Sequence, residues 1–214
     1  MRTDDLIADL AGRAAVVRPL PPPLFRAIGW LVLAGACAAA AVTVFGARAD
    51  VMVRLQQPDY LSIAVLALST SVFAAVISFV LAIPGAERTP LLRVTALAIF
   101  GLWVGTSVWR VLAAGRGLPL ATNPHWPVCF GRVVLVSLLP AVALFVMLRR
   151  GTPLQPGSTA AMGAAAAASA GALAVILACP LDDSGHAFLG HLMPVMAIAA
   201  IGIALRRTLT SPDG

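Results

Sequence analysis

The chain has 214 residues, of which 60% are hydrophobic and only 11% are charged, and its mean hydropathy is +0.94. Soluble domains contain about 45–50% apolar and about 25% charged residues, so this composition excludes an ordinary soluble enzyme, a disordered tail and a fibre. The net charge is +6 and every basic residue is arginine, but no run of five or six basic residues occurs, so we expect no direct contact with nucleic acid.

Residues 1–26 precede the first long apolar stretch, and we expect them to form a cytoplasmic partner-binding segment built on a short amphipathic helix. Thr3 can cap this helix, and Asp4 and Asp5 lie in its first turn, where the helix dipole favours carboxylates. The apolar positions recur at helical spacing and are Leu6, Ile7, Leu10, Ala14 and Val17. Such a stripe can enter a groove of a partner or lie on the bilayer, but the balanced charge of the segment gives anionic lipid little to attract.

Six long apolar stretches follow, and each is long enough to cross a bilayer as a helix, which needs about 20 residues. The predicted fold class is therefore all-α, a polytopic membrane protein with six transmembrane helices in a domain that covers residues 27–207. The predicted spans are 27–45, 61–83, 91–114, 130–148, 158–178 and 188–205. Residues 208–214 remain as a short cytoplasmic tail.

The arginines predict the orientation of these spans. With a cytoplasmic N-terminus, ten arginines lie inside and five lie outside, which is the pattern that membrane insertion favours. The pairs Arg149-Arg150 and Arg206-Arg207 each follow an apolar span and mark its inner end. We therefore predict that both termini are cytoplasmic and that the lipid bilayer surrounds the spans.

The predicted topology places Cys129 and Cys179 at the same outer end of the helices, although 50 residues separate them in the sequence. Further groups that bind metals lie nearby: His125, Asp182, Asp183 and His186, with His191 just inside the last span. These residues are the candidate sensing and metal-ligating groups. The ligand that they suit is a transiently bound soft metal ion, and we predict no resident cofactor.

Each of these residues also has a simpler interpretation. Two thiols at one membrane depth can form a structural disulfide in an oxidising compartment. His125 beside Trp126 can belong to an interfacial aromatic cluster, and the two aspartates can lie in a loop and cap the last helix. The third cysteine, Cys37, lies in the middle of a span and is expected to be a small packing residue.

Motifs of common enzymes are absent from the sequence. It has no Gly-Lys-Ser/Thr phosphate loop, no His-Glu-x-x-His, no Gly-x-Ser-x-Gly and no Cys-x-x-Cys. We therefore predict a binding protein and not an enzyme. The alternative function is a small transporter or channel for a metal or another solute, although no span carries an acid in its middle and transporters normally need intramembrane charges or broken helices.

Three short motifs carry a resemblance to a known family: Arg-Thr-Asp-Asp-Leu-Ile-x-x-Leu at 2–10, Arg-Arg-Gly-x-Pro at 149–153 and Cys-x-x-Asp at 179–182. Together with the six spans, they resemble the NrsF family of anti-sigma factors of the bacterial inner membrane. The resemblance implies that the cytoplasmic segment, matched here by Thr3–Val17, holds an extracytoplasmic-function sigma factor inactive. It also implies that two outer-face cysteines, matched by Cys129 and Cys179, release the sigma factor under metal or related stress. It does not extend to the histidines and aspartates.

Overall fold

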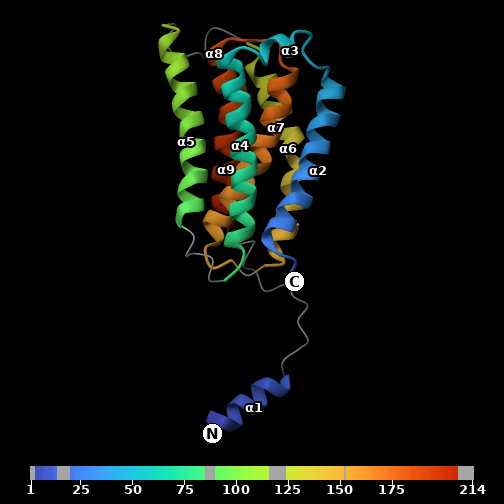
Figure 1. Cartoon of the computed structure of the whole chain (residues 1–214), viewed down its shortest axis with the longest axis vertical. Coiled ribbons are helices and arrows are strands. Elements are labelled where there is room, and N and C mark those ends of the chain that lie inside the picture. Colours follow the sequence, from blue (N-terminus) through green and yellow to red (C-terminus); the bar gives the residue numbers. More distant parts are fainter. Residues whose placement is uncertain (1–2, 14–19, 85–89, 116–123, 152, 207–214) are drawn as a thin grey trace.

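The computed structural model describes residues 3–13, 20–84, 90–115, 124–151 and 153–206. This part of the chain is helical and contains no strand, and six of its helical segments are long and apolar enough to cross a membrane. Figure 1 shows these six segments side by side in one bundle. The predicted fold class is therefore confirmed, and the protein is a multi-pass membrane protein.

Five of the six spans begin at a proline or directly before one. They are α2 (Pro23–Phe45), α4 (Pro58–Leu81), α5 (Pro90–Ala113), α6 (Trp126–Arg149) and α7 (Pro156–Ala178). Proline suits the first turn of a helix because its fixed φ is helical and no carbonyl there needs its missing N–H. For this reason the helices extend as many as four residues further toward the N-terminus than the apolar stretches indicate.

The sixth span is not one regular α-helix. It consists of α8 (Ser184–Ala187), the π-helical turn η3 (Phe188–Leu192) and α9 (Met193–Ala204). The N–H of Met193 donates to the carbonyl of Phe188, five residues earlier, as in a π-helix. Pro194 follows directly, and because it has no N–H it cannot donate to the carbonyl of Gly190, as a regular α-helix would require.

Helix α7 lies at the centre of the bundle and packs against α2, α4, α6 and α9. It is buried along most of its length because alanine, glycine and serine dominate its sequence, and such small residues let neighbouring helices approach closely in lipid. The approach to α6 is very close at Gly171. A Cβ added at Gly171 would overlap the Ser137 hydroxyl and lie 2.8 Å from the carbonyl oxygen of Val133.

We expect Gly171→Ala to lower the free energy of unfolding by about 1–3 kcal/mol because the added methyl group overpacks the contact between α6 and α7. The matched control is Gly131→Ala in α6, where an added Cβ meets no atom within 4 Å. Both changes alter helix propensity in the same way, so thermal unfolding of the two purified variants in detergent isolates the packing effect. Equal melting temperatures would contradict the close approach.

The two ends of the bundle differ in what they carry. At the terminal end, defined here as the end with Pro23 and Ala204, the first span begins and the last one finishes, at the bottom of the bundle in Figure 1. The opposite end, called the cysteine end, carries the short helix α3 (Val51–Arg54) and α8. Helix α1 (Thr3–Arg13) stands apart from the bundle on the side of the terminal end.

Candidate metal site

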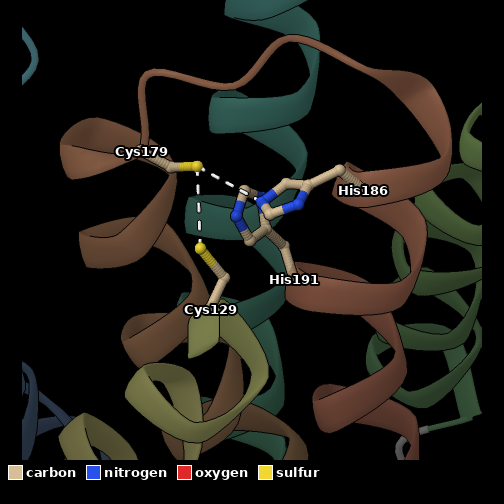
Figure 2. Close-up of side chains that lie close together, drawn as sticks. All are labelled: Cys129, Cys179, His186 and His191. Carbon is tan, nitrogen blue, oxygen red and sulfur yellow. Dashed lines mark hydrogen bonds between the residues drawn. The ribbon is translucent and has the colours of Figure 1, made fainter. Parts of the chain in front are cut away.

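Four buried side chains from three parts of the sequence meet at the cysteine end (Figure 2). Cys129 lies in the first turn of α6, Cys179 directly follows α7, His186 is in α8, and His191 is in η3. Each offers one ligand atom, and these atoms all lie within 4.8 Å of one another. These four residues are called the Cys2His2 cluster below.

The π-helical turn explains how two histidines of one span reach the same site. In a regular α-helix, side chains five residues apart point about 140° away from each other. A π turn pairs residue i with residue i+5 and so brings such side chains toward one side. His186 lies in α8 and His191 lies five residues later within η3, and their ring centroids are 5.4 Å from each other.

The two thiols of the cluster lie close together without a disulfide bond between them. The Sγ atoms of Cys129 and Cys179 are 3.7 Å apart, and Sγ of Cys179 is 3.3 Å from Nε2 of His186. The hydrogen bond from the Cys129 thiol, supported by weaker ones from the two histidines, lowers the pKa of Cys179, although burial opposes this. A low pKa favours the thiolate, which is the form that binds metals.

The imidazoles are buried without full hydrogen bonding. His186 and His191 are 1% and 5% exposed, and neither Nδ1 of His186 nor Nε2 of His191 has a hydrogen-bond partner. Leaving a buried polar atom unpaired costs about 1–3 kcal/mol, and such atoms in a folded protein commonly indicate a site for an ion, a water or a proton.

The donor set and its spacing suit a tetrahedral metal ion. Two thiolates and two imidazoles are a common ligand set for Zn²⁺, with metal–sulfur bonds of about 2.3 Å and metal–nitrogen bonds of about 2.0 Å, which separate the ligand atoms by about 3.4–3.8 Å. The 3.7 Å between the two sulfurs and the 3.3 Å from Cys179 to His186 are close to these values. The cluster can therefore hold one borderline or soft metal ion, and its two thiols can alternatively form a disulfide.

Arg48 anchors the loop that carries Cys179. Its side chain, 3% exposed, donates to the carbonyl of Cys179 at 3.0 Å and forms ion pairs with Asp50 and Asp182. Its guanidinium also lies 5.2 Å from the centre of the Tyr60 ring. Ion-pair hydrogen bonds to Asp50 and Asp182 raise the pKa of Arg48, and the bond from Arg48 holds the pKa of Asp50 at about 2. The Asp50 pair is therefore present at neutral pH and is lost only as the pH falls from about 4 toward 2.

The other candidate ligands named from the sequence lie outside the Cys2His2 cluster. Asp182 pairs with Arg48 and Arg54, and Asp183 accepts a hydrogen bond from the backbone N–H of His186 at 3.0 Å and so caps α8. His125 directly precedes α6 and is not one of the four clustered residues. His191, which the sequence places just inside the last span, is the fourth member.

The predicted partner-binding residues belong to the N-terminal segment. Thr3, Asp4, Asp5 and Ile7 are exposed on α1, and Ile7 is 59% exposed. Leu6 and Leu10 belong to the same helix, but their side chains are outside the described part of the structure, and Ala14 and Val17 lie outside the described residues altogether, as does the predicted tail at 208–214. The large exposed Ile7 leaves an apolar contact available to a partner.

We expect Arg48→Gln to destabilise the cysteine end, because the buried hydrogen bond from the charged guanidinium to the Cys179 carbonyl is worth about 1.5–3 kcal/mol. Thermal unfolding of the purified protein should shift downward by several degrees. The control is Arg110→Gln, since Arg110 is also close to this end but its hydrogen bond to the carbonyl of Asp59 is exposed. An equal shift in both variants would show that Arg48 does not anchor the loop.

The chain matches the model of a known protein family. The family model NrsF, described as negative regulator of sigma F, matches residues 10–211 and so covers nearly the whole chain. The match begins within α1 and includes all six spans and the four residues of the Cys2His2 cluster. No individual curated protein and no solved structure matches the chain.

Proposed function

Because this chain belongs to the NrsF family of negative regulators of sigma F, we propose that it is a membrane-bound anti-sigma factor that acts by binding and release. As a member of that family, it is a negative regulator of a sigma factor. In our proposal the partner is an extracytoplasmic-function sigma factor, which residues 1–26 hold inactive. Release follows when a metal ion reaches the Cys2His2 cluster under stress.

The proposed orientation places the terminal end of the bundle in the cytoplasm and the cysteine end in the periplasm of a bacterial inner membrane. The split of ten arginines against five supports this orientation. It puts α1 in the compartment of the sigma factor and the thiols in the compartment that a metal from outside reaches first. A regulator with this arrangement separates the sensor from the effector by the thickness of the bilayer.

The observation that carries the proposed sensing role is the spacing of the ligand atoms in the Cys2His2 cluster. They lie up to 4.8 Å apart, whereas a tetrahedral ion requires about 3.4–3.8 Å. An ion would therefore draw the ligand atoms together by as much as about an ångström, and in our proposal the parts of α6, α7 and the sixth span that carry them follow. A ligand shifts a conformational equilibrium only through its differential affinity for the two states, and this contraction supplies such a difference.

Two contacts between α6 and α2 offer a route across the membrane. Helix α6 carries Cys129 at the cysteine end, and α2 continues directly from the N-terminal segment. The indole N–H of Trp30 in α2 donates to the carbonyl of Pro140 in α6 at 2.8 Å, and the guanidinium of Arg26 donates to the carbonyl of Met147. A displacement of α6 would therefore move α2 and, with it, the proposed effector segment.

Titration of the reduced, purified chain with Co²⁺ tests the proposed metal site. Tetrahedral cobalt bound by thiolates absorbs intensely in the visible and near-ultraviolet, whereas six-coordinate cobalt in water does not. We expect one ion per chain, and we expect each of Cys129→Ser, Cys179→Ser, His186→Gln and His191→Gln to weaken binding by about tenfold or more.

The controls for this titration are Cys37→Ser and His125→Gln, which alter the same residue types outside the Cys2His2 cluster and should leave the affinity unchanged. Zn²⁺ should displace the cobalt and remove the absorption, in line with the general order of affinities. Weak six-coordinate binding, or binding that survives all four ligand substitutions, would overturn the proposed site.

A further inference from the structure

A second feature of the bundle lies outside the proposed sensing mechanism. A groove of about 370 Å³ runs between α6, α7 and α9 in the half of the bundle nearer the terminal end. Small residues of α7 and Gly202 of α9 line it together with larger apolar side chains of α6 and α9. Its lining includes Ala141, Phe145, Gly163, Ile198 and Gly202.

The groove exists because α7 and α9 touch at its floor while α6 stands further from α9. A Cβ added at Gly202 would lie 2.8 Å from the carbonyl oxygen of Ala160 and 2.8 Å from the Cβ of Ala164, so these helices are in backbone contact there. Along α6 the groove extends from Val134 to Leu148, which at 1.5 Å per residue is about 20 Å. A long, narrow and almost wholly apolar channel of this kind suits an extended acyl chain.

Two arginines lie where the groove reaches the terminal end. Leu148 and Leu205 line this end of the groove, and Arg149 and Arg206 follow them directly in the sequence. The Arg149 guanidinium lies 5.9 Å from the centre of the Phe145 ring, which also lines the groove. Both arginines are exposed, and within the described part of the chain neither forms an ion pair with an acid.

We propose that the groove binds one acyl chain of an anionic phospholipid whose headgroup phosphate pairs with Arg149 and Arg206. The apolar lining fits the chain and the two exposed guanidinium groups fit the phosphate, which arginine binds through paired N–H donors. Basic pockets between transmembrane helices on the cytoplasmic side are typical sites for anionic headgroups. A zwitterionic lipid would leave the positive charge of this end uncompensated.

This lipid would contact the same three helices that carry or adjoin the Cys2His2 cluster at the other end. Cys129 is on α6, and Cys179 directly follows α7. His191 is separated from the start of α9 by one residue, Leu192. A lipid in the groove would therefore stabilise the relative positions of these helices. This role is independent of the identity of the sigma factor and of the metal.

Native mass spectrometry of the full-length chain tests the proposal. The purified protein is delipidated in mild detergent and offered phosphatidylglycerol or phosphatidylcholine with identical acyl chains. We expect about a thirtyfold preference for retaining phosphatidylglycerol, since each of the two arginines near an anionic headgroup contributes about 1 kcal/mol. The double variant Arg149→Gln/Arg206→Gln should lose this preference, and Arg110→Gln/Arg132→Gln at the cysteine end should keep it.

A second variant tests the groove itself. Ala141→Phe places a ring in the groove and should abolish retention of phosphatidylglycerol, while cobalt binding at the Cys2His2 cluster reports that the variant is folded. Equal retention of the two lipids, a preference that survives the double arginine variant, or full retention in folded Ala141→Phe would each overturn the proposal. So would a dimer of the wild-type chain that cross-links through Ile201 at the groove and excludes lipid.

Discussion

Replacing Cys129 or Cys179 with serine is expected to abolish release of the sigma factor during metal stress while leaving the sigma factor held in unstressed cells. A serine hydroxyl is a much poorer ligand than a thiolate for a borderline or soft metal, so either change removes one of four ligands. We expect release of the sigma factor to be almost completely lost. A site with three remaining ligands binds the metal too weakly to shift the equilibrium between the state that holds the sigma factor and the state that releases it. The two single variants should behave alike.

Expression of a reporter from a promoter of the sigma factor, with and without added Zn²⁺ or Cd²⁺, measures this effect. Cys37→Ser is the matched control, since Cys37 lies within α2 and outside the Cys2His2 cluster. A normal response in either cysteine variant would contradict the sensing role. Constitutive expression with loss of the chain from the membrane would indicate that the two cysteines are structural.

His191→Gln separates the two chemistries that the thiols allow. If the input is a metal ion, this variant loses a ligand and its response should fall with that of the cysteine variants. If the input is formation of a disulfide between Cys129 and Cys179, the histidine is not a reactant and the response should persist. Mass spectrometry of alkylated protein, taken before and after stress, shows directly whether the thiols become oxidised.

The second large effect is expected in α1. Ile7→Asp or Leu10→Asp should release the sigma factor without any stress and raise expression of its target genes. Burial of a large apolar side chain in a partner groove contributes about 1.5–3 kcal/mol before ordering costs, and a buried aspartate reverses that gain. The expected loss of affinity is therefore about tenfold to a hundredfold.

Ala8→Asp is the control for this effect, because Ala8 is exposed and lies on the opposite side of α1 from the apolar stripe. Co-purification of the sigma factor with the full-length chain from solubilised membranes measures the loss, and an immunoblot of the same membranes reports the amount of each variant. Unchanged co-purification of Ile7→Asp and Leu10→Asp would contradict the assignment of the apolar stripe as the binding surface.

The sequence was sufficient to predict the six spans, since the length and hydropathy of each apolar stretch depend on the local sequence alone. It also predicted that Cys129 and Cys179 lie at one end of the bundle, because counting spans fixes the end to which each loop belongs. The structure brings Cys129, Cys179 and His186 together, and all three are among the candidate ligands predicted from the sequence.

Other features depended on contacts that the sequence does not display. The π-helical turn at Phe188–Leu192 was not predictable from hydropathy, and without it His191 would point away from His186. The partners of Asp182 are Arg48 and Arg54, 134 and 128 residues earlier, so the aspartate could not be distinguished from a metal ligand. From the sequence, Arg26 is one of the ten arginines that predict the orientation of the spans. In the structure its side chain is buried and donates a hydrogen bond to α6.

In the proposed mechanism, a metal ion bound in the Cys2His2 cluster at one end of the bundle releases the sigma factor at the other end. The most direct test is a titration of the purified complex of the full-length chain and its sigma factor with Zn²⁺ or Cd²⁺, in which bound metal and bound sigma factor are measured in the same samples. The sigma factor should dissociate in parallel with binding of one ion per chain, and the Cys129→Ser complex should stay intact over the same range. Retention of the sigma factor at full occupancy, or equal dissociation of the wild-type and Cys129→Ser complexes, would contradict this mechanism.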